Sequence, residues 1–317
     1  MVTVAVISWN SAQDLPACLS SLRDVVDAGY AQVFVVDNAS TDGAPDLVKE
    51  EFPWAHLIRS ERNLGFGAAG NLAFRSCKSP WFAVGNADIE LRPGALRTLV
   101  CTGEDSGRAG ILAPGVEELS GALVASTAAF PRVRGAMLAA TGLRSLHPGL
   151  RRYSDFGRQT KLGSNLAVEW ALGAFLLFRN EAFASFGGFD DDQWLYGEDL
   201  EVCWRAARAG WEVLYVPSAR VLHRGGASSS QVWTNSEVEV RKARAGYEWI
   251  RRRRGEWRAV LISLLRIAGA ALRVIVWTVG QRAGVVDESR ASESRVWLQI
   301  NREAALQALS HPRARTK

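Results

Sequence analysis

Residues Gln32–Gly43 read QVFVVD-NASTDG, an apolar run that ends in a carboxylate and continues into short polar residues. The β-branched and apolar residues over 32–37, without a period of 3.6, predict a buried strand. The polar residues that follow are typical of a turn, and a helix is expected over 42–51. A buried strand that leads through a polar turn into a helix is the repeating unit of an open α/β sheet.

The same unit recurs on both sides of this stretch. Leu15, Leu19, Leu22 and Val26 repeat at helical spacing, with apolar runs before and after them. Strands are expected over residues 2–8, 54–59 and 81–85, and helices over 11–26 and 67–76. The alternation through the first hundred residues predicts an α/β fold with a largely parallel, doubly wound central sheet flanked by helices.

The rest of the chain is less regular. Residues 106–165 are rich in Gly, Arg and Ser, and we expect strands and loops that form one wall of a cleft. Further on, the pattern predicts an apolar segment over 171–178, a helix over 200–209 and a strand over 212–216.

Size and cysteine content narrow the class of protein. The chain has 317 residues, 48% of them apolar, which is enough for one large α/β domain with an appendage or for two modest domains. Its four cysteines are scattered without a C-x-x-C pair, which indicates reduced thiols in the cytoplasm. The first ten residues lack the basic and apolar regions of a secretory signal.

Short polar side chains follow three of the predicted strands. They are Asn10, the run Asp37–Gly43, and the triplet Asn86-Ala87-Asp88. Ligands of open α/β sheets bind beyond the carboxyl ends of the strands, where such residues can hold a base, a ribose and a diphosphate. The alternative is that they only cap helices or form turns.

Two acidic regions predict reaction chemistry. Asp88, at the mouth of a buried strand, can hold a divalent cation against a diphosphate, unless it is a solvated turn residue. His223 is either a second metal ligand or a loop histidine. Glu198, Asp199 and Glu201 lie at the start of a predicted helix, where a carboxylate can accept a proton from an attacking hydroxyl or can simply favour the helix dipole.

Gly65–Gly70 (GFGAAG) matches the G-x-G-x-x-G pattern of dinucleotide-binding enzymes, and Asp88 lies at a suitable distance beyond it. A dehydrogenase is therefore a rival hypothesis. However, five residues separate the pattern from the strand ending at Arg59, and two strand–helix units precede it. Both features are unusual for that fingerprint.

Taken together, the motifs resemble glycosyltransferase family 2, the large inverting family with the GT-A fold, and its rhamnosyltransferase-like branch in particular. The matching segments are VAVISWNSAQDLPACLSSL (Val4–Leu22), VVDNASTDG (Val35–Gly43), RNLGFGAAGN (Arg62–Asn71), GNADIEL (Gly85–Leu91), WALGAFLLFRNEAFASFGGFDD (Trp170–Asp191), YGEDLEVCWRAARAGW (Tyr196–Trp211) and YVPSARVLHRGGAS (Tyr215–Ser228). The resemblance covers about the first 230 residues.

The resemblance implies roles for individual residues. Asp199 resembles the general base, Asp88 the metal-binding acid and His223 the late histidine of the metal site. The residues implied to bind the donor are Asn10, Asp37, Asn38, Asn63, Gly65, Asn71 and Asn86. Those implied to position the acceptor are Trp170, Glu198 and Glu201.

This sequence departs from the branch at two places. Asn86 replaces the first acid of the D-x-D element and Ala87 its usual proline, while Glu201 replaces the second aspartate of the E-D-x-D run. One carboxylate can still hold a metal that is bound mainly by diphosphate. A catalytically silent homologue that binds sugar nucleotides stays open as an alternative, and so, more remotely, does a nucleotidyltransferase.

The expected function is that of a metal-dependent inverting glycosyltransferase in cell-wall or polysaccharide biosynthesis. The resemblance favours dTDP-rhamnose as donor, Mn²⁺ or Mg²⁺ as cofactor, and a glycan or lipid-linked acceptor. The sequence does not settle the oligomeric state.

The C-terminal part, 231–317, is expected to form a basic, amphipathic helical extension to a catalytic domain over 1–230. Residues 259–280 are long enough to span a bilayer, but Arg266 and Arg273 lie on one helical face and each costs about 2.5–3.5 kcal/mol at the bilayer centre. The pattern favours a helix in the membrane interface, with Arg251–Arg254 and Arg258 attracted to anionic lipid. A core or dimer helix is the alternative. No nucleic acid is expected, and the chain is placed in the cytoplasm or on the inner face of the membrane.

Overall fold

The computed structural model describes residues 1–143, 164–225, 233–282 and 288–310, which fall into two compact units. The first unit contains residues 1–128 and 164–225. The second contains residues 129–143 together with the described residues from 233 onward. The domain boundary predicted between 230 and 231 lies outside the described residues.

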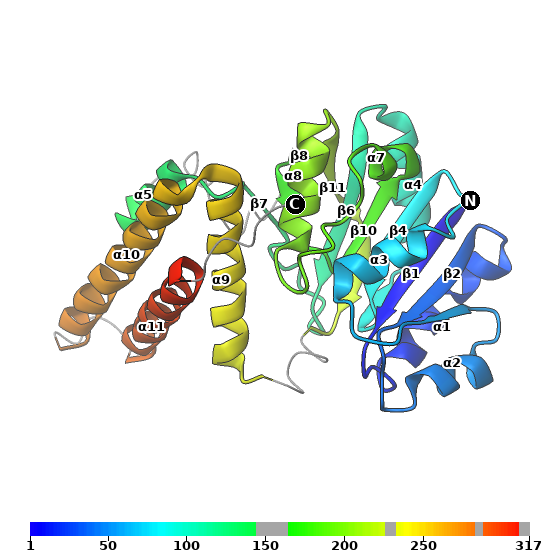
Figure 1. Ribbon diagram of the computed structural model, residues 1–317, viewed down its shortest axis with the longest axis horizontal. Coiled ribbons are helices and arrows are strands. Elements are labelled where there is room, and N and C mark those ends of the chain that lie inside the picture. The colour runs from blue at the N-terminus through cyan, green and yellow to red at the C-terminus, as the bar shows by residue number, and fades with distance from the viewer. Residues whose placement is uncertain (144–163, 226–232, 283–287, 311–317) are drawn as a thin grey trace. The chain divides into compact units, whose positions relative to one another are not determined.

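The first hundred residues fold as the predicted alternation of strands and helices (Figure 1). The elements are β1 (Val2–Ser8), α1 (Leu15–Asp27), β2 (Ala31–Asp37), α2 (Ala44–Glu51), β3 (His56–Arg59), α3 (Phe66–Phe74) and β4 (Trp81–Asn86). The second helix begins at Ala44 rather than at residue 42. Asp42 stays outside it because its carboxylate accepts a hydrogen bond from the Ala44 N–H.

The remaining elements of the first unit complete the sheet and its helices. They are β5 (Ile89–Leu91), α4 (Ala95–Asp105), β6 (Ala109–Glu117), β7 (Thr127–Ala128), β8 (Leu166–Val168), β9 (Trp170–Ala171), β10 (Phe175–Arg179), α7 (Asn180–Ser185), α8 (Glu198–Arg208) and β11 (Glu212–His223). The strand predicted over 212–216 is longer than expected. It continues past Pro217 through an irregularity in its pairing with β6, where the missing proline N–H costs the sheet no hydrogen bond.

The strands form a mixed sheet in the order β3-β2-β1-β4-β10-β6-β11-β5, with β8 beside β11. β1, β2, β3, β4, β6 and β11 run in one direction, and β5, β8 and β10 run against them. The predicted α/β class and the mainly parallel direction of the strands are confirmed. The antiparallel β10 between β4 and β6 was not predicted.

The sheet has an apolar layer on each face. Val2, Val4 and Val6 of β1 belong to one core cluster with side chains of α1, α2 and α4. On the other face, phenylalanine rings pack edge to face or tilted, at centroid distances of 5.2 Å for Phe82 with Phe183 and 5.7 Å for Phe178 with Phe189. Phe189, in the segment that leads from α7 to α8, packs against this aromatic layer.

That segment, residues 187–194, is held by α3 and α8. The Asn71 amide on α3 accepts a hydrogen bond from the Phe189 N–H (3.0 Å) and donates to the Phe189 carbonyl (3.0 Å) and the Asp191 carboxylate (2.7 Å). From α8, Arg205 donates to the Gly188 carbonyl at 3.3 Å. The segment therefore has a fixed backbone despite its glycines and aspartates.

The second unit is helical, as predicted for the C-terminal extension. It contains α5 (Val133–Ala140), α9 (Asn235–Arg254), α10 (Glu256–Arg282) and α11 (Glu288–Ser310). A capping box at Thr234 and Glu237 begins α9. Trp249 is buried and stacks on Phe130, and the Tyr247 hydroxyl donates to Asn301 on α11. Within the described residues, α10 is long and apolar enough to cross a membrane.

The two adjacent glycines of the 187–194 segment give a matched pair of substitutions. Both have positive φ, +77° at Gly187 and +65° at Gly188. A Cβ at Gly187 meets open space, whereas one at Gly188 would lie 2.5 Å from Asn71 Oδ1 and 2.9 Å from the Phe183 ring. We expect Gly188→Ala to lower the free energy of unfolding by about 1–3 kcal/mol more than Gly187→Ala, measured by urea denaturation. Equal losses would show that the segment is not clamped by Asn71.

Candidate functional site

The carboxyl ends of several strands meet at one edge of the sheet. Parallel pairing places Ser8 of β1 opposite Asp37 of β2, and Ile7 opposite Asn86 of β4. His223, at the end of β11, pairs with Ile89 just beyond β4. The structure thus brings the predicted donor-binding and metal-binding residues from distant parts of the sequence to a single edge.

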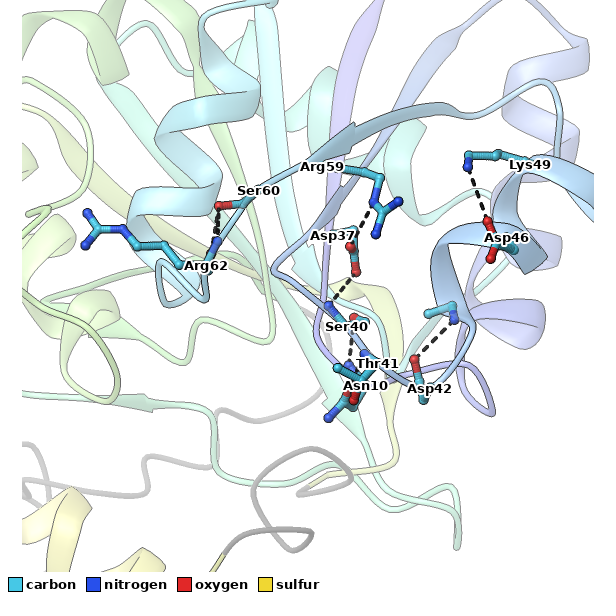
Figure 2. A network of polar contacts seen from close by, with 11 residues as sticks. Asn10, Asp37, Ser40, Thr41, Asp42, Asp46, Lys49, Arg59, Ser60 and Arg62 are labelled. Carbon is cyan, nitrogen blue, oxygen red and sulfur yellow. Dashed lines mark hydrogen bonds and ion pairs between the residues drawn. The ribbon is translucent and has the colours of Figure 1, made fainter.

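The loops after β1 and β2 are joined by hydrogen bonds (Figure 2). The Asn10 N–H donates to Ser40 Oγ at 2.9 Å, and the Thr41 N–H donates to Asn10 Oδ1 at 2.9 Å. Asp42 accepts from the Ala12 N–H at 2.7 Å. Asn10 has a left-handed backbone, with φ +48°, which the two loops fix in place. These contacts make a rigid floor next to Asp37.

Asp37 is buried, and only one of its two carboxylate oxygens accepts a hydrogen bond from the described residues. Its Oδ1 accepts a hydrogen bond from the Ser40 N–H at 3.2 Å. Its Oδ2 lies 3.6 Å from the Arg59 Nε, too far for a hydrogen bond, and has no other hydrogen-bond partner among the described residues (Figure 2). A buried carboxylate oxygen without a donor is costly unless a ligand supplies one. Asp37 therefore suits an N–H or O–H group of a nucleoside.

The other predicted donor-binding amides are engaged by the protein itself. Asn38 accepts from the Leu64 N–H and donates to the Gly65 carbonyl. Asn63 Oδ1 accepts from the Gly65 N–H at 2.9 Å, and Asn71 holds the 187–194 segment. These side chains shape the loop before α3, and direct donor contact by them stays a prediction.

The G-x-G-x-x-G pattern has a packing explanation. A Cβ at Gly65 would lie 1.9 Å from the Trp194 carbonyl oxygen. At Gly67 and Gly70 a Cβ would meet the Phe189 side chain at 2.9 Å and 3.2 Å. All three glycines are needed for contact between α3 and the segment before α8, and no dinucleotide is required to account for them.

Asp88 and His223 form the predicted metal pair. His223 Nε2 lies 3.2 Å from Asp88 Oδ1 and 3.4 Å from the Asn86 amide nitrogen. Asp88 Oδ1 is buried and makes no well-aligned hydrogen bond to any of the described residues. One ring nitrogen cannot both donate to Asp88 and accept from Asn86. A divalent cation bound by Asp88 and His223 would satisfy both ligands, so the residues present fit a metal.

The protein offers few ligands for such an ion. Among the described residues, no three His, Cys, Asp or Glu side chains gather around one point. A metal held here would take its other ligands from phosphate oxygens and water, as Mg²⁺ and Mn²⁺ do in nucleotide enzymes.

Sequence reasoning missed three charged residues beside this pair. The Arg224 guanidinium lies 2.6 Å from Glu90 Oε1, and the Arg224 backbone N–H donates to the Asp88 carbonyl at 3.1 Å. The pKa of Asp14 is raised by burial and then by the negative charge of Asp88. The position of Arg224, next to His223 in the sequence, was the available signal. Nothing in the pattern around Asp14 separated it from a helix cap.

The predicted base lies at the first turn of α8. Asp199 Oδ1 accepts from the Leu200 N–H at 2.7 Å, and Oδ2 accepts from the Gly173 N–H at 3.2 Å. The next residue, Ala174, accepts a hydrogen bond from the Asn86 N–H at 3.1 Å. The short Gly173–Ala174 segment thus connects Asp199 to the strand that leads to Asp88.

Glu198 and Asp199 share one electrostatic environment. Burial and then the neighbouring Asp199 charge raise the pKa of Glu198 to about 8, and burial also raises the pKa of Asp199. Among the described residues, Glu198 Oε2 has no hydrogen-bond partner, whereas Asp199 accepts two N–H groups. These two donors favour the charged form of Asp199, while burial without a donor favours the neutral form of Glu198.

The two remaining predicted acceptor residues are largely enclosed. Glu201 is fully buried and forms an ion pair with Arg205 at 3.2 Å, so it braces α8. Trp170 is 8% exposed and pairs with Ala128 in a two-stranded sheet of β7 and β9. Any contact of these residues with an acceptor stays a prediction.

Comparison with known proteins places this geometry in a family. The family model "Glycosyl transferase family 2" matches residues 3–118, and "Glycosyl transferase family group 2" matches residues 137–279. The chain is 31% identical over 245 residues to an N-acetylglucosaminyl-diphospho-decaprenol L-rhamnosyltransferase of Mycobacterium tuberculosis, covering 73% of this chain and 78% of the relative. The chain belongs to glycosyltransferase family 2.

Other relatives agree with this family assignment. A pre-mycofactocin glycosyltransferase of Mycobacterium tuberculosis is 28% identical, covering 70% of this chain and 42% of the relative. The structure of a mannosyltransferase from Pyrobaculum calidifontis with GDP-Man and Mn²⁺ aligns with a TM-score of 0.60 at 16% identity, covering 98% of this chain and 87% of that one. This likeness confirms the GT-A fold. The chain is a family 2 glycosyltransferase of the rhamnosyltransferase-like branch, so the dehydrogenase and nucleotidyltransferase hypotheses are dropped.

The raised pKa of Glu198 gives this glycosyltransferase a pH-dependent stability. Between its ordinary value of 4.5 and about 8, the native chain holds a proton on Glu198 that the unfolded chain releases. Stability therefore falls as pH rises through this window. We expect Glu198→Gln to raise the Tm, by more at about pH 9 than at about pH 5.

The exposed Glu50 on α2 supplies the control, as Glu50→Gln should leave the Tm difference between the two pH values unchanged. Differential scanning calorimetry at both pH values measures the effect. A Tm difference between Glu198→Gln and wild type that does not grow with pH would mean that Glu198 is not a buried neutral acid.

Proposed function

We propose that this glycosyltransferase moves rhamnose from dTDP-rhamnose to a glycan or lipid-linked acceptor with inversion, using Mn²⁺ or Mg²⁺. The main observation behind the proposal is the pair of hydrogen bonds made by Gly173 and Ala174. Gly173 donates to Asp199, which is suited to act as a base, and Ala174 accepts from Asn86, next to Asp88, which is suited to bind a metal. The rhamnosyltransferase relative supports the choice of sugar, and the Mn²⁺ in the mannosyltransferase structure supports the metal.

Asp199 acts as the general base in this proposal. Its two N–H donors favour the carboxylate form, which can take the proton of the acceptor hydroxyl. As that oxygen bonds to the anomeric carbon, the bond to the diphosphate breaks and its electron pair leaves with the diphosphate. Backside attack inverts the anomeric centre. The N–H groups of Gly173 and Leu200 keep the carboxylate oriented throughout.

The donor end of the site rests on Asp37, Asp88 and His223. Asp88 and His223 would hold the divalent metal, which supplies positive charge to the leaving diphosphate. Asp37 accepts an N–H or O–H of the nucleoside with its free Oδ2. Asn10 fixes the loop that lines the same pocket.

The acceptor is proposed to be a lipid-linked glycan of cell-wall or polysaccharide biosynthesis, reached from the cytoplasm at the membrane face. The relative's name specifies a diphospho-decaprenol acceptor. Trp194, four residues before Glu198, is 45% exposed, and its indole N–H donates to the Asn63 carbonyl. Its ring offers an aromatic surface of the kind that packs against sugars.

The base assignment predicts that Asp199→Asn lowers the rate of transfer by about 10²-fold or more, because the amide cannot accept the hydroxyl proton. Donor binding should persist, since Asp199 is assigned to the acceptor side. Release of nucleoside diphosphate in the presence of acceptor measures the rate, and Glu181→Gln on the exposed start of α7 is the control. Near-normal turnover of the Asp199→Asn variant would remove Asp199 from the reaction.

The donor assignment predicts a thermal shift in a screen of nucleoside diphosphates and sugar nucleotides with and without Mn²⁺. A ligand at a hundred times its Kd stabilises by about 2.7 kcal/mol, so a shift should be measurable. Thymidine nucleotides should give the largest shift, and Mn²⁺ should increase it. Asp88→Asn should remove the Mn²⁺-dependent part alone, and Asp37→Asn should reduce the whole shift. If no nucleotide shifts the wild type, the donor proposal fails and a silent homologue becomes the better account.

A further inference from the structure

Helix α10 carries a continuous stripe of exposed apolar side chains. The stripe recurs every three or four residues along the helix and contains no charge. Its members are Trp257, Val260, Leu261, Leu264, Ala268, Leu272, Ile275, Val276 and Val279. Leu264, Ile275 and Val279 are each about as exposed as on an isolated helix, at 59%, 61% and 62%. Apolar surface of this extent is typical of a contact surface.

The opposite face of α10 packs against other helices of the second unit. It is built mainly of small residues, with Ala259, Ile262, Ser263, Gly269 and Ala270 buried. A Cβ at Gly269 would lie 2.5 Å from the Ala140 Cα, so α5 crosses α10 at backbone contact distance. One face of α10 therefore packs in the helical unit, and 28% of its most apolar window is buried. The stripe is the exposed apolar surface on the other side.

Two of the four arginines of α10, Arg266 and Arg273, contact the protein. The Arg266 guanidinium lies over the Tyr247 ring at 5.2 Å, and Arg273 donates to the Ala139 carbonyl at 3.2 Å. The sequence correctly put both on one helical face with Gly269 and Ala270. That face is the one that packs in the helical unit, so the cost of burying these charges in a bilayer does not arise for the stripe.

Basic residues cluster where the stripe begins. Residues 251–258 contain five arginines and one glutamate, and Arg252, Arg253 and Arg258 are exposed. Trp257 is 60% exposed, and the Arg258 guanidinium lies 4.4 Å from the centre of its ring. Tryptophan and arginine at the end of an apolar helical face are typical of side chains at the level of lipid headgroups.

We propose that the helical unit docks on an anionic lipid surface through the α10 stripe, with α10 parallel to the membrane and Arg252, Arg253 and Arg258 against the headgroups. The clustered positive charge complements anionic lipid, and the uncharged stripe matches the acyl boundary. The proposed docking surface is remote in sequence from the donor site. The inference rests on the proposed function in one respect, since a lipid-linked acceptor is the reason that the enzyme would need to bind a membrane.

The test is flotation of the full chain with vesicles of phosphatidylcholine alone or mixed with phosphatidylglycerol. The wild type should float with the anionic vesicles only, and added salt should weaken binding. Arg252→Gln and Arg253→Gln should each lower the partition coefficient about fivefold, and Leu264→Glu with Ile275→Glu should abolish flotation. Leu119→Glu, at a 75% exposed leucine of the first unit, is the matched control and should float like the wild type.

Two further measurements separate the possible failures. Circular dichroism should show unchanged helicity in the Leu264→Glu, Ile275→Glu variant, because both side chains are exposed and contribute little to the core. Binding of nucleotide with Mn²⁺, measured in solution, reports on the donor site alone. Failure to float with nucleotide binding intact overturns the docking surface and leaves the proposed function standing. A dimer of the wild type that the stripe variant loses, in light scattering, would overturn lipid in favour of a second copy of the chain.

Discussion

Parallel pairing of β1 with β2 and β4 is the constraint from which the site follows. The register that sets Ser8 opposite Asp37, and Ile7 opposite Asn86, ends three strands at one edge. The last residues before the carboxyl ends of these strands are mainly apolar and buried, so polar side chains appear together where the sheet stops. β11, which runs in the same direction, adds His223 to that edge. The chemistry of the site is thus a consequence of strand direction and length.

The buried acids fall into two groups, according to whether arginines and hydrogen bonds of the protein compensate their charge. Glu117 lies between Arg92 and Arg220 at 3.0 Å and 2.8 Å, and Glu201 pairs with Arg205. These acids hold elements together, and Arg92 and Arg220 lower the pKa of Glu117 despite its burial. In contrast, Asp37, Asp88 and Glu198 each keep a buried oxygen without a hydrogen bond to the part of the chain that the structure describes. Such atoms are costly unless a ligand, metal or proton satisfies them, which makes these acids candidates for a functional site.

The sequence predicted the parts of the fold that depend on local pattern, and missed those that depend on distant packing. Periodicity located β1 to β4 and their helices to within a few residues. For residues 106–165 the pattern indicated strands and loops but did not locate β6, because the glycines and proline of AGILAPGVE conceal a strand whose nine residues are all buried. Periodicity also identified the residues at the strand ends. It could not show that the side-chain amides of Asn38 and Asn71 form hydrogen bonds with neighbouring loops. Hydrogen-bond partners far away in the chain decide that question, and no local spacing encodes them.

The same limit explains α10. Its spacing fixed which residues share a face, since helical geometry is local, but not which face the protein would cover. Gly269 decides this, because only a residue without a Cβ lets Ala140 approach to backbone contact. Once that face is covered, Arg266 and Arg273 find partners in the helical unit and the uncharged residues are left outside. By composition alone α10 could cross a bilayer, but its packing turns Arg266 and Arg273 toward the protein and leaves an uncharged stripe exposed.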